Sequence, residues 1–156
     1  MRVHLGCDHA GYEYKEILRQ RLAEAGHEIV DHGAHTYDAL DDYPPFCIET
    51  AQGVVEDEGK GIHALGIVIG GSGNGEQIAA NKVDGARCAL VWSTATARLA
   101  REHNNANLMG LGARQHSVEE ALELVTTFLN TSFVTGDEAV RHQRRIDLLT
   151  DFETHR

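Results

Sequence analysis

The chain has 156 residues, of which 42% are hydrophobic, and its formal net charge is -10 at pH 7. This length and composition suffice to bury a core without disulfides or metals, so we expect one soluble domain over residues 1–156. The charge argues against a nucleic-acid partner, and the sequence has no apolar run near the roughly 20 residues of a membrane span.

Strand-like and helix-like segments alternate along the chain. Apolar runs predict strands at residues 3–7, 28–31, 65–69, 87–91 and 108–112. Apolar spacing and cap residues predict helices that end before Gly26, start at Pro44 and Pro45, cover 77–82, follow Ser93 to about 105, follow the Ser117-x-x-Glu120 capping box, and cover about 138–153. This alternation predicts a Rossmann-like, doubly wound α/β fold: a parallel five-stranded sheet with helices on both faces and a C-terminal helix.

The cysteines and the N-terminus bear on location. Cys7, Cys47 and Cys88 are an odd set without C-x-x-C spacing, which indicates reduced, structural thiols. The strand pattern starts at residue 3, so we expect no signal peptide. Both features favour a cytoplasmic protein.

The most informative segment is the run GGSGNGE at residues 70–76, between a buried strand and a helix. Such a turn leaves backbone N–H groups free to bind an anion or a developing oxyanion, and a carboxylate at its edge, Glu76, is suited to act as a base. The alternative is a tight turn whose glutamate is favoured by the helix dipole. A P-loop motif is absent, and Glu76 replaces the third glycine of a dinucleotide motif, so neither nucleotide site is expected.

Further polar residues follow other strands. Ligands of doubly wound folds bind beyond the carboxyl ends of the strands, so we expect Asp8, His9 and Arg114 to lie near the glycine-rich run. Taken alone, Asp8 is also consistent with a helix N-cap. His103 is likewise consistent with a histidine that merely stabilises a helix C-terminus.

The last predicted helix is rich in arginine. Arg141 and Arg145 are four residues apart and share a face, whereas Arg144 points elsewhere. A dianion such as phosphate would neutralise the pair, although solvated surface arginines are the alternative. No strand follows this helix, so we expect it to pack on the domain or on a second subunit. The ten histidines show no metal-ligand spacing, so no metal site is expected.

Five motifs together resemble type B ribose-5-phosphate isomerase over nearly the full length of the chain. They are GCDHAG at 6–11, GGSGNGE at 70–76, AANK at 79–82, EHNN at 102–105 and RHQRRI at 141–146. The resemblance implies interconversion of ribose 5-phosphate and ribulose 5-phosphate through a cis-enediolate, as in the pentose phosphate pathway. It also implies no metal or organic cofactor, and a homodimer with its sites at the subunit interface.

The resemblance also implies roles for individual residues. Glu76 would move a proton from C2 to C1, and Ser72 would assist the loop backbone in holding the enediolate oxygens. His103 would open the sugar ring, with Asp8 assisting. The other residues expected to bind the substrate are His9, Gly71, Gly73, Gly75, Asn104, Arg114, Arg141, His142 and Arg145.

One position departs from a large branch of this family. That branch has a cysteine base where this chain has Gly70, so the chain is most similar to the actinobacterial branch with a glutamate base. Two alternatives stay open: an isomerase of another phosphosugar (allose 6-phosphate, galactose 6-phosphate or a four-carbon ketose phosphate), or a non-catalytic module that binds a phosphosugar or nucleotide. In the expected homodimer the last helix packs across the interface through Ile146, Leu148, Leu149 and Phe152.

Overall fold

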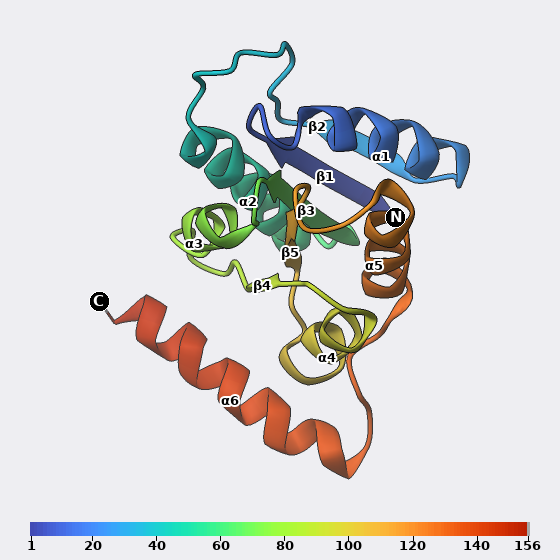
Figure 1. The fold of residues 1–156 in the computed structure, drawn as a ribbon. Coiled ribbons are helices and arrows are strands. Elements are labelled where there is room, and N and C mark those ends of the chain that lie inside the picture. The colour runs from blue at the N-terminus through green and yellow to red at the C-terminus, as the bar shows by residue number, and fades with distance from the viewer. Residues whose placement is uncertain (156) are drawn as a thin grey trace.

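A computed structural model describes residues 1–155, in which a parallel sheet is covered by helices on both faces (Figure 1). The strands are β1 (Arg2–Cys7), β2 (Glu28–Asp31), β3 (Ala64–Gly70), β4 (Cys88–Leu90) and β5 (Leu108–Gly112). The helices are α1 (Tyr12–Glu24), α2 (Tyr43–Gly59), α3 (Asn74–Ala80), α4 (Thr94–Asn104), α5 (Val118–Asn130) and α6 (Asp137–Thr154). Within residues 1–155, no helix combines the length and the apolar character needed to cross a membrane.

The strand order is β2-β1-β3-β5-β4, and each neighbouring pair is parallel. The predicted α/β fold is therefore confirmed. From β1 the chain moves outward to β2, whereas from β3 it moves to the opposite side of the sheet. The gap between β1 and β3 is thus a topological switch point, where ligands of doubly wound folds bind.

Alternate residues of the strands face two separate cores. On one face Ile67 and Ile69 of β3 pack in a cluster with residues from α1, α4 and α5. On the other face Val68 packs with residues from α2 and α3. A strand turns successive side chains to opposite faces, so a sheet buried on both sides needs the continuous apolar run that the sequence shows.

Helix α3 starts earlier than predicted. The sequence places its start at Gln77, but the helix begins at Asn74, inside the glycine-rich run. Gly73 is its N-cap, with φ of +81°, a left-handed conformation that glycine adopts at little cost. Glu76 consequently lies in the first helical turn, where the dipole favours a negative charge.

Helix α6 follows Gly136 and packs mainly on α4, extending away from the body of the fold (Figure 1). Within one chain it buries His142 and Ile146, and Glu153 Oε2 accepts a hydrogen bond from the Gly85 N–H at 2.9 Å. Its other large apolar side chains stay exposed: Val140, Leu148, Leu149 and Phe152. Of the apolar face predicted for an interface, Ile146 alone is therefore covered in the chain itself.

Candidate active site

Asp8 and His9 follow β1 in a tight turn. Asp8 Oδ1 accepts hydrogen bonds from the N–H groups of Ala10 at 2.9 Å and Gly11 at 3.3 Å. The N-cap of α1 is Gly11, so the alternative reading of Asp8 as that cap is wrong. A Cβ at Gly11 would overlap the carbonyl of Ile69, so glycine lets this turn lie against the end of β3.

Glu76 packs directly over the last residue of β3. A Cβ at Gly70 would overlap both carboxylate oxygens and the carboxyl carbon of Glu76. The absence of a side chain at position 70 is therefore what gives this carboxylate its place at the carboxyl edge of the sheet.

The surroundings of Glu76 suit a proton acceptor. The residue is 4% exposed, and burial raises the pKa of its carboxyl group. The negative charge of Asp8 raises that pKa further, while the N–H groups of Glu76 and Gly73 oppose the shift. A carboxylate with a raised pKa binds a proton more readily, which is what a general base near neutral pH requires.

A test of this packing is Gly70→Ala. We expect kcat to fall by about 10- to 100-fold, because the new methyl group must displace the Glu76 carboxylate and small misplacements of reacting groups are costly. The matched control is Gly59→Ala, since a Cβ there meets open space at the end of α2. The measurement is kcat of both variants from steady-state kinetics. A normal kcat for Gly70→Ala would show that activity does not depend on the Glu76 carboxylate lying over residue 70.

The remaining residues of the glycine-rich run meet Arg114 and Tyr43. The Arg114 guanidinium lies over Gly71, since a Cβ there would be 3.3 Å from Nη1. Ser72 Oγ accepts hydrogen bonds from the Asn74 N–H at 3.3 Å and side-chain amide at 3.2 Å. The Tyr43 ring packs over Gly75, a contact that sequence reasoning missed; a tyrosine just before Pro44-Pro45 gave no functional signal.

The carboxyl edge of the sheet therefore carries one group of the predicted site residues. It comprises Asp8, His9, Gly71, Ser72, Gly73, Gly75, Glu76 and Arg114. We call this group the base half-site.

His103 and Asn104 lie at the opposite edge. Helix α4 runs from the carboxyl end of β4 to the amino end of β5. The Arg87 side chain, just before β4, donates to the carbonyls of Asn104 at 3.2 Å and Asn105 at 2.9 Å, which places the end of α4 at the amino edge. From there to Gly70, the sheet spans four residue steps, about 13 Å. One chain therefore does not bring His103 to Glu76.

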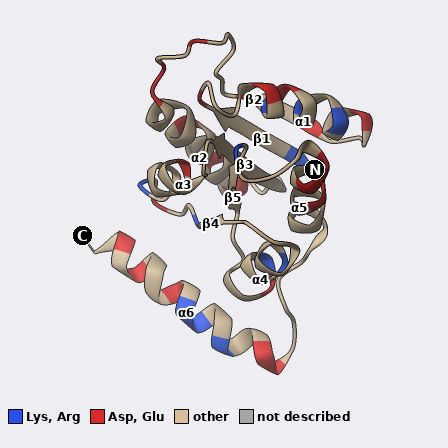
Figure 2. Cartoon of the chain, viewed as in Figure 1, with Lys and Arg blue, Asp and Glu red and all other residues tan. Residues whose placement is uncertain are grey.

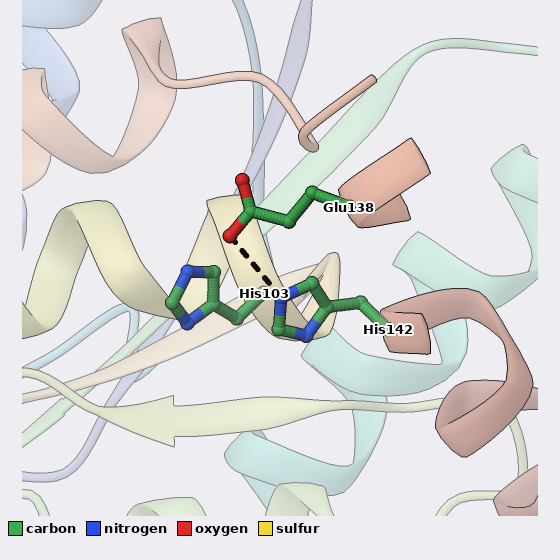
Figure 3. A group of neighbouring side chains, drawn as sticks. All are labelled: His103, Glu138 and His142. Carbon is green, nitrogen blue, oxygen red and sulfur yellow. Dashed lines mark ion pairs between the residues drawn. The ribbon is translucent and has the colours of Figure 1, made fainter. Parts of the chain in front are cut away.

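His103 meets residues of α6 instead (Figure 3). Its ring stacks on that of His142, with centroids 4.3 Å apart and planes 11° from parallel. Glu138 Oε1 lies 3.9 Å from His142 Nε2, and Arg141 Nη2 lies 3.5 Å from the same atom. Burial, followed by the nearby His103 and Arg141, lowers the pKa of His142.

His103, Glu138 and His142 are close enough to be considered as metal ligands. The sequence did not suggest this set, because two ligands come from α6 and the third from α4. However, the two rings are nearly parallel and stacked, so the lone pairs in their planes do not converge on one ion. As arranged, the two stacked rings are not placed to chelate a metal ion.

Arg145 and Asn104 line a pocket of about 250 Å³ between α4, α6 and β4, together with Arg87 and Ile146. Arg144 lines a different pocket, which confirms that it points away from Arg145. Figure 2 shows these basic residues in the middle of α6, between acidic ends. We call the second group (His103, Asn104, Arg141, His142 and Arg145) the arginine half-site.

Comparisons with known proteins agree with this architecture. A family model described as Ribose/Galactose Isomerase matches residues 3–149. A Mycobacterium leprae protein named ribose-5-phosphate isomerase B is 60% identical over 156 residues, covering 99% of this chain and 92% of that protein. A Bacillus subtilis protein named putative sugar phosphate isomerase YwlF is 35% identical, covering 98% and 97%. The solved structure of ribose-5-phosphate isomerase B from Mycoplasma genitalium with bound ribulose-5-phosphate has a TM-score of 0.89 and 38% identity, covering 99% and 97%.

Proposed function

Because this chain belongs to the ribose/galactose isomerase family, we propose that it interconverts ribose 5-phosphate and ribulose 5-phosphate. The named relatives and the ribulose-5-phosphate bound in a structural neighbour support this substrate. The observation that carries the proposal is the buried Glu76 carboxylate, which lies over Gly70 and is influenced by Asp8 and by the N–H groups of Glu76 and Gly73.

In the proposed reaction Glu76 removes the proton from C2 of the open-chain aldose. The resulting cis-enediolate is held by the backbone N–H groups of Gly71, Gly73 and Gly75, with Ser72 assisting. Glu76 then returns the proton to C1, which requires no movement of the base because both carbons present the same face to it. The C2 hydroxyl also gives up its proton and the C1 oxygen gains one, so no electrons leave the substrate and these residues act without an organic redox cofactor.

We further propose that the active unit is a homodimer in which each site is shared. The base half-site of one subunit faces the arginine half-site of the other, because within one chain these groups lie at opposite edges of the sheet. His103 of the partner subunit then opens the ring, with Asp8 assisting. The exposed apolar residues Leu148, Leu149 and Phe152 of α6 support an interface there.

The phosphate group is proposed to lie between the two half-sites. His9 and Arg114 contact it from one subunit, and the partner's Arg141 and the partner's Arg145 from the other, with His142 nearby. Asn104 of the partner subunit contacts the sugar. Within residues 1–155, Arg114, Arg141 and Arg145 form no ion pair with an acidic side chain, so a dianion at this place would neutralise them.

Replacing Arg145 with alanine should raise KM about tenfold or more and change kcat little, since a charge-assisted hydrogen bond contributes roughly 1.5–3 kcal/mol to binding. The control is Arg144→Ala, because Arg144 lines a different pocket on the same helix. Saturation kinetics with ribose 5-phosphate should separate the two variants. Equal losses would mean that these are ordinary surface arginines.

The function itself is tested by initial rates on the 5-phosphate of ribose and on the phosphates of allose, galactose and erythrose. We expect the highest kcat/KM with ribose 5-phosphate. A preference for another sugar would favour the second candidate, to which the broader name of the B. subtilis relative points. Binding of ribose 5-phosphate without turnover would indicate a non-catalytic module.

The proposal places the enzyme in the cytoplasm, which three free, buried cysteines support.

A further inference from the structure

His9 is held by a carboxylate that no sequence motif singled out. Asp41 Oδ1 lies 2.7 Å from His9 Nδ1, and the same oxygen accepts the His9 backbone N–H at 2.9 Å. Asp41 lies in the segment between β2 and α2, remote in sequence from His9. One oxygen thus fixes both the main chain and the ring of His9.

The other neighbours of His9 and Asp41 form no further hydrogen bonds with the two side chains among the described residues. Asp8 Oδ2 is 4.0 Å from His9 Nδ1, too far for a hydrogen bond, and the exposed Tyr37 meets the ring edge-on at 6.5 Å. Asp41 Oδ2 is buried and has no hydrogen-bond partner among residues 1–155. The Asp41 side chain is therefore placed for His9 rather than for a wider network.

The chemistry of the pair determines the state of the ring. An ionised carboxylate only accepts hydrogen bonds, so His9 Nδ1 must donate and carry a proton. A neutral histidine free in solution can carry its ring proton on either nitrogen. A carboxylate that accepts a hydrogen bond from Nδ1 commonly selects the form protonated there. His9 Nε2 makes no hydrogen bond with any described residue, so it is the ring atom left for a ligand.

We propose that Asp41 is the positioning residue of His9: it locks the imidazole with Nδ1 protonated and presents Nε2 to the phosphosugar. This inference rests on the proposed function for the identity of the ligand, but the locked ring is a property of the protein alone. Asp41 does not touch the reacting carbons; its effect passes through His9.

The first test is nitrogen-15 NMR of the histidine rings in the full-length protein without substrate, with the His9 signals assigned from their loss in His9→Asn. We expect a Nδ1–H correlation for His9 in the wild type and in Asp42→Ala, and its loss in Asp41→Ala. Asp42 is the matched control, because it is adjacent and exposed and its side chain makes no cap hydrogen bond. A Nδ1–H signal that persists in Asp41→Ala overturns the proposal whatever reaction the enzyme catalyses.

The second test is kinetic. Asp41→Ala should lower kcat/KM for ribose 5-phosphate by about 10- to 100-fold, mostly through KM, as loss of an orienting carboxylate typically does. Asp41→Asn keeps an acceptor oxygen in place and should recover part of the loss, and Asp42→Ala should stay within about twofold. In a His9→Ala background the Asp41→Ala change should cost almost nothing more, because its effect passes through the missing ring.

Two outcomes contradict the inference and leave the proposed function standing. The first is an active enzyme in which Asp41→Ala and Asp42→Ala have the same kcat/KM. The second is full additivity of the losses in kcat/KM from Asp41→Ala and His9→Ala, which would indicate a general role in holding the loop. A wild-type protein that fails to isomerise ribose 5-phosphate but shows the Asp41-dependent Nδ1–H signal would contradict the function and support the positioning role.

Discussion

Replacing Glu76 with glutamine should lower kcat by about 10²–10⁴ in both directions of the isomerisation, while substrate binding is largely kept. Glutamine preserves the size of the side chain over Gly70 but cannot accept the C2 proton. The matched control is Glu56→Gln, which changes a surface residue paired with Lys60 and should leave the kinetics near normal. Near-normal turnover of Glu76→Gln would rule out the mechanism.

The raised pKa of Glu76 predicts two further differences between the wild type and Glu76→Gln, one in the pH dependence of activity and one in stability. In the wild type, kcat/KM should fall on acidification at a pH above the ordinary carboxyl value of 4.5, and this limb should be absent from the residual activity of Glu76→Gln. A carboxyl group with a raised pKa stabilises the fold fully below its unfolded pKa and loses that contribution as the pH rises through its folded pKa.

It follows that the ionised, buried Glu76 weakens the fold at neutral pH. Glu76→Gln should therefore have a higher Tm than the wild type at pH 7, and the difference should shrink as the pH is lowered toward 4.5. Thermal unfolding at several pH values measures this. A variant less stable than the wild type at pH 7 would mean that the carboxylate is better compensated than its burial indicates.

His103→Ala should impair the two directions unequally. Ribose 5-phosphate is mostly cyclic and needs a proton shuttle to open its ring, the role proposed for this histidine. Ribulose 5-phosphate cannot close to a furanose and reaches the site open. We expect the initial rate from ribose 5-phosphate to fall by about 10²-fold or more and the rate from ribulose 5-phosphate to fall much less.

Initial rates in both directions at saturating substrate test this separation. The control is His63→Ala, since His63 is exposed and lies just before β3, outside both half-sites. Equal loss in both directions for His103→Ala would show that the residue does not act in ring opening.

Much of the fold follows from local signals in the sequence. The capping boxes at Ser93 and Ser117 start α4 and α5, and the apolar runs become strands. Only the first of these boxes pairs with a threonine, Thr96, rather than an acid. The buried face of α5 is harder to predict, because spacing alone allows either leucine: Leu124 is buried, while Leu122 is only partly covered. Here tertiary packing, which spacing alone does not specify, decides which side of the helix is covered.

The candidate site was only partly predictable. The rule that ligands bind at the carboxyl edge correctly gathers Asp8, Glu76 and Arg114. It says nothing of His103, which lies at the amino edge because a helix between parallel strands runs against them. The stacking of His103 on His142 joins segments far apart in the chain, and the contact of Asp41 with His9 depends on the path of a loop. Neither leaves a periodic trace in the sequence.

In the proposed homodimer each site takes Glu76 from one subunit and His103 from the other. This arrangement is tested by mixing Glu76→Gln and His103→Ala chains after reversible dissociation and measuring turnover of ribose 5-phosphate. In an equal mixture half of the dimers are mixed and one of their two sites is intact, so we expect about a quarter of the wild-type activity from two nearly inactive proteins. Activity that stays at the mean of the two separate variants would contradict the shared site and place Glu76 and His103 in the same subunit's site.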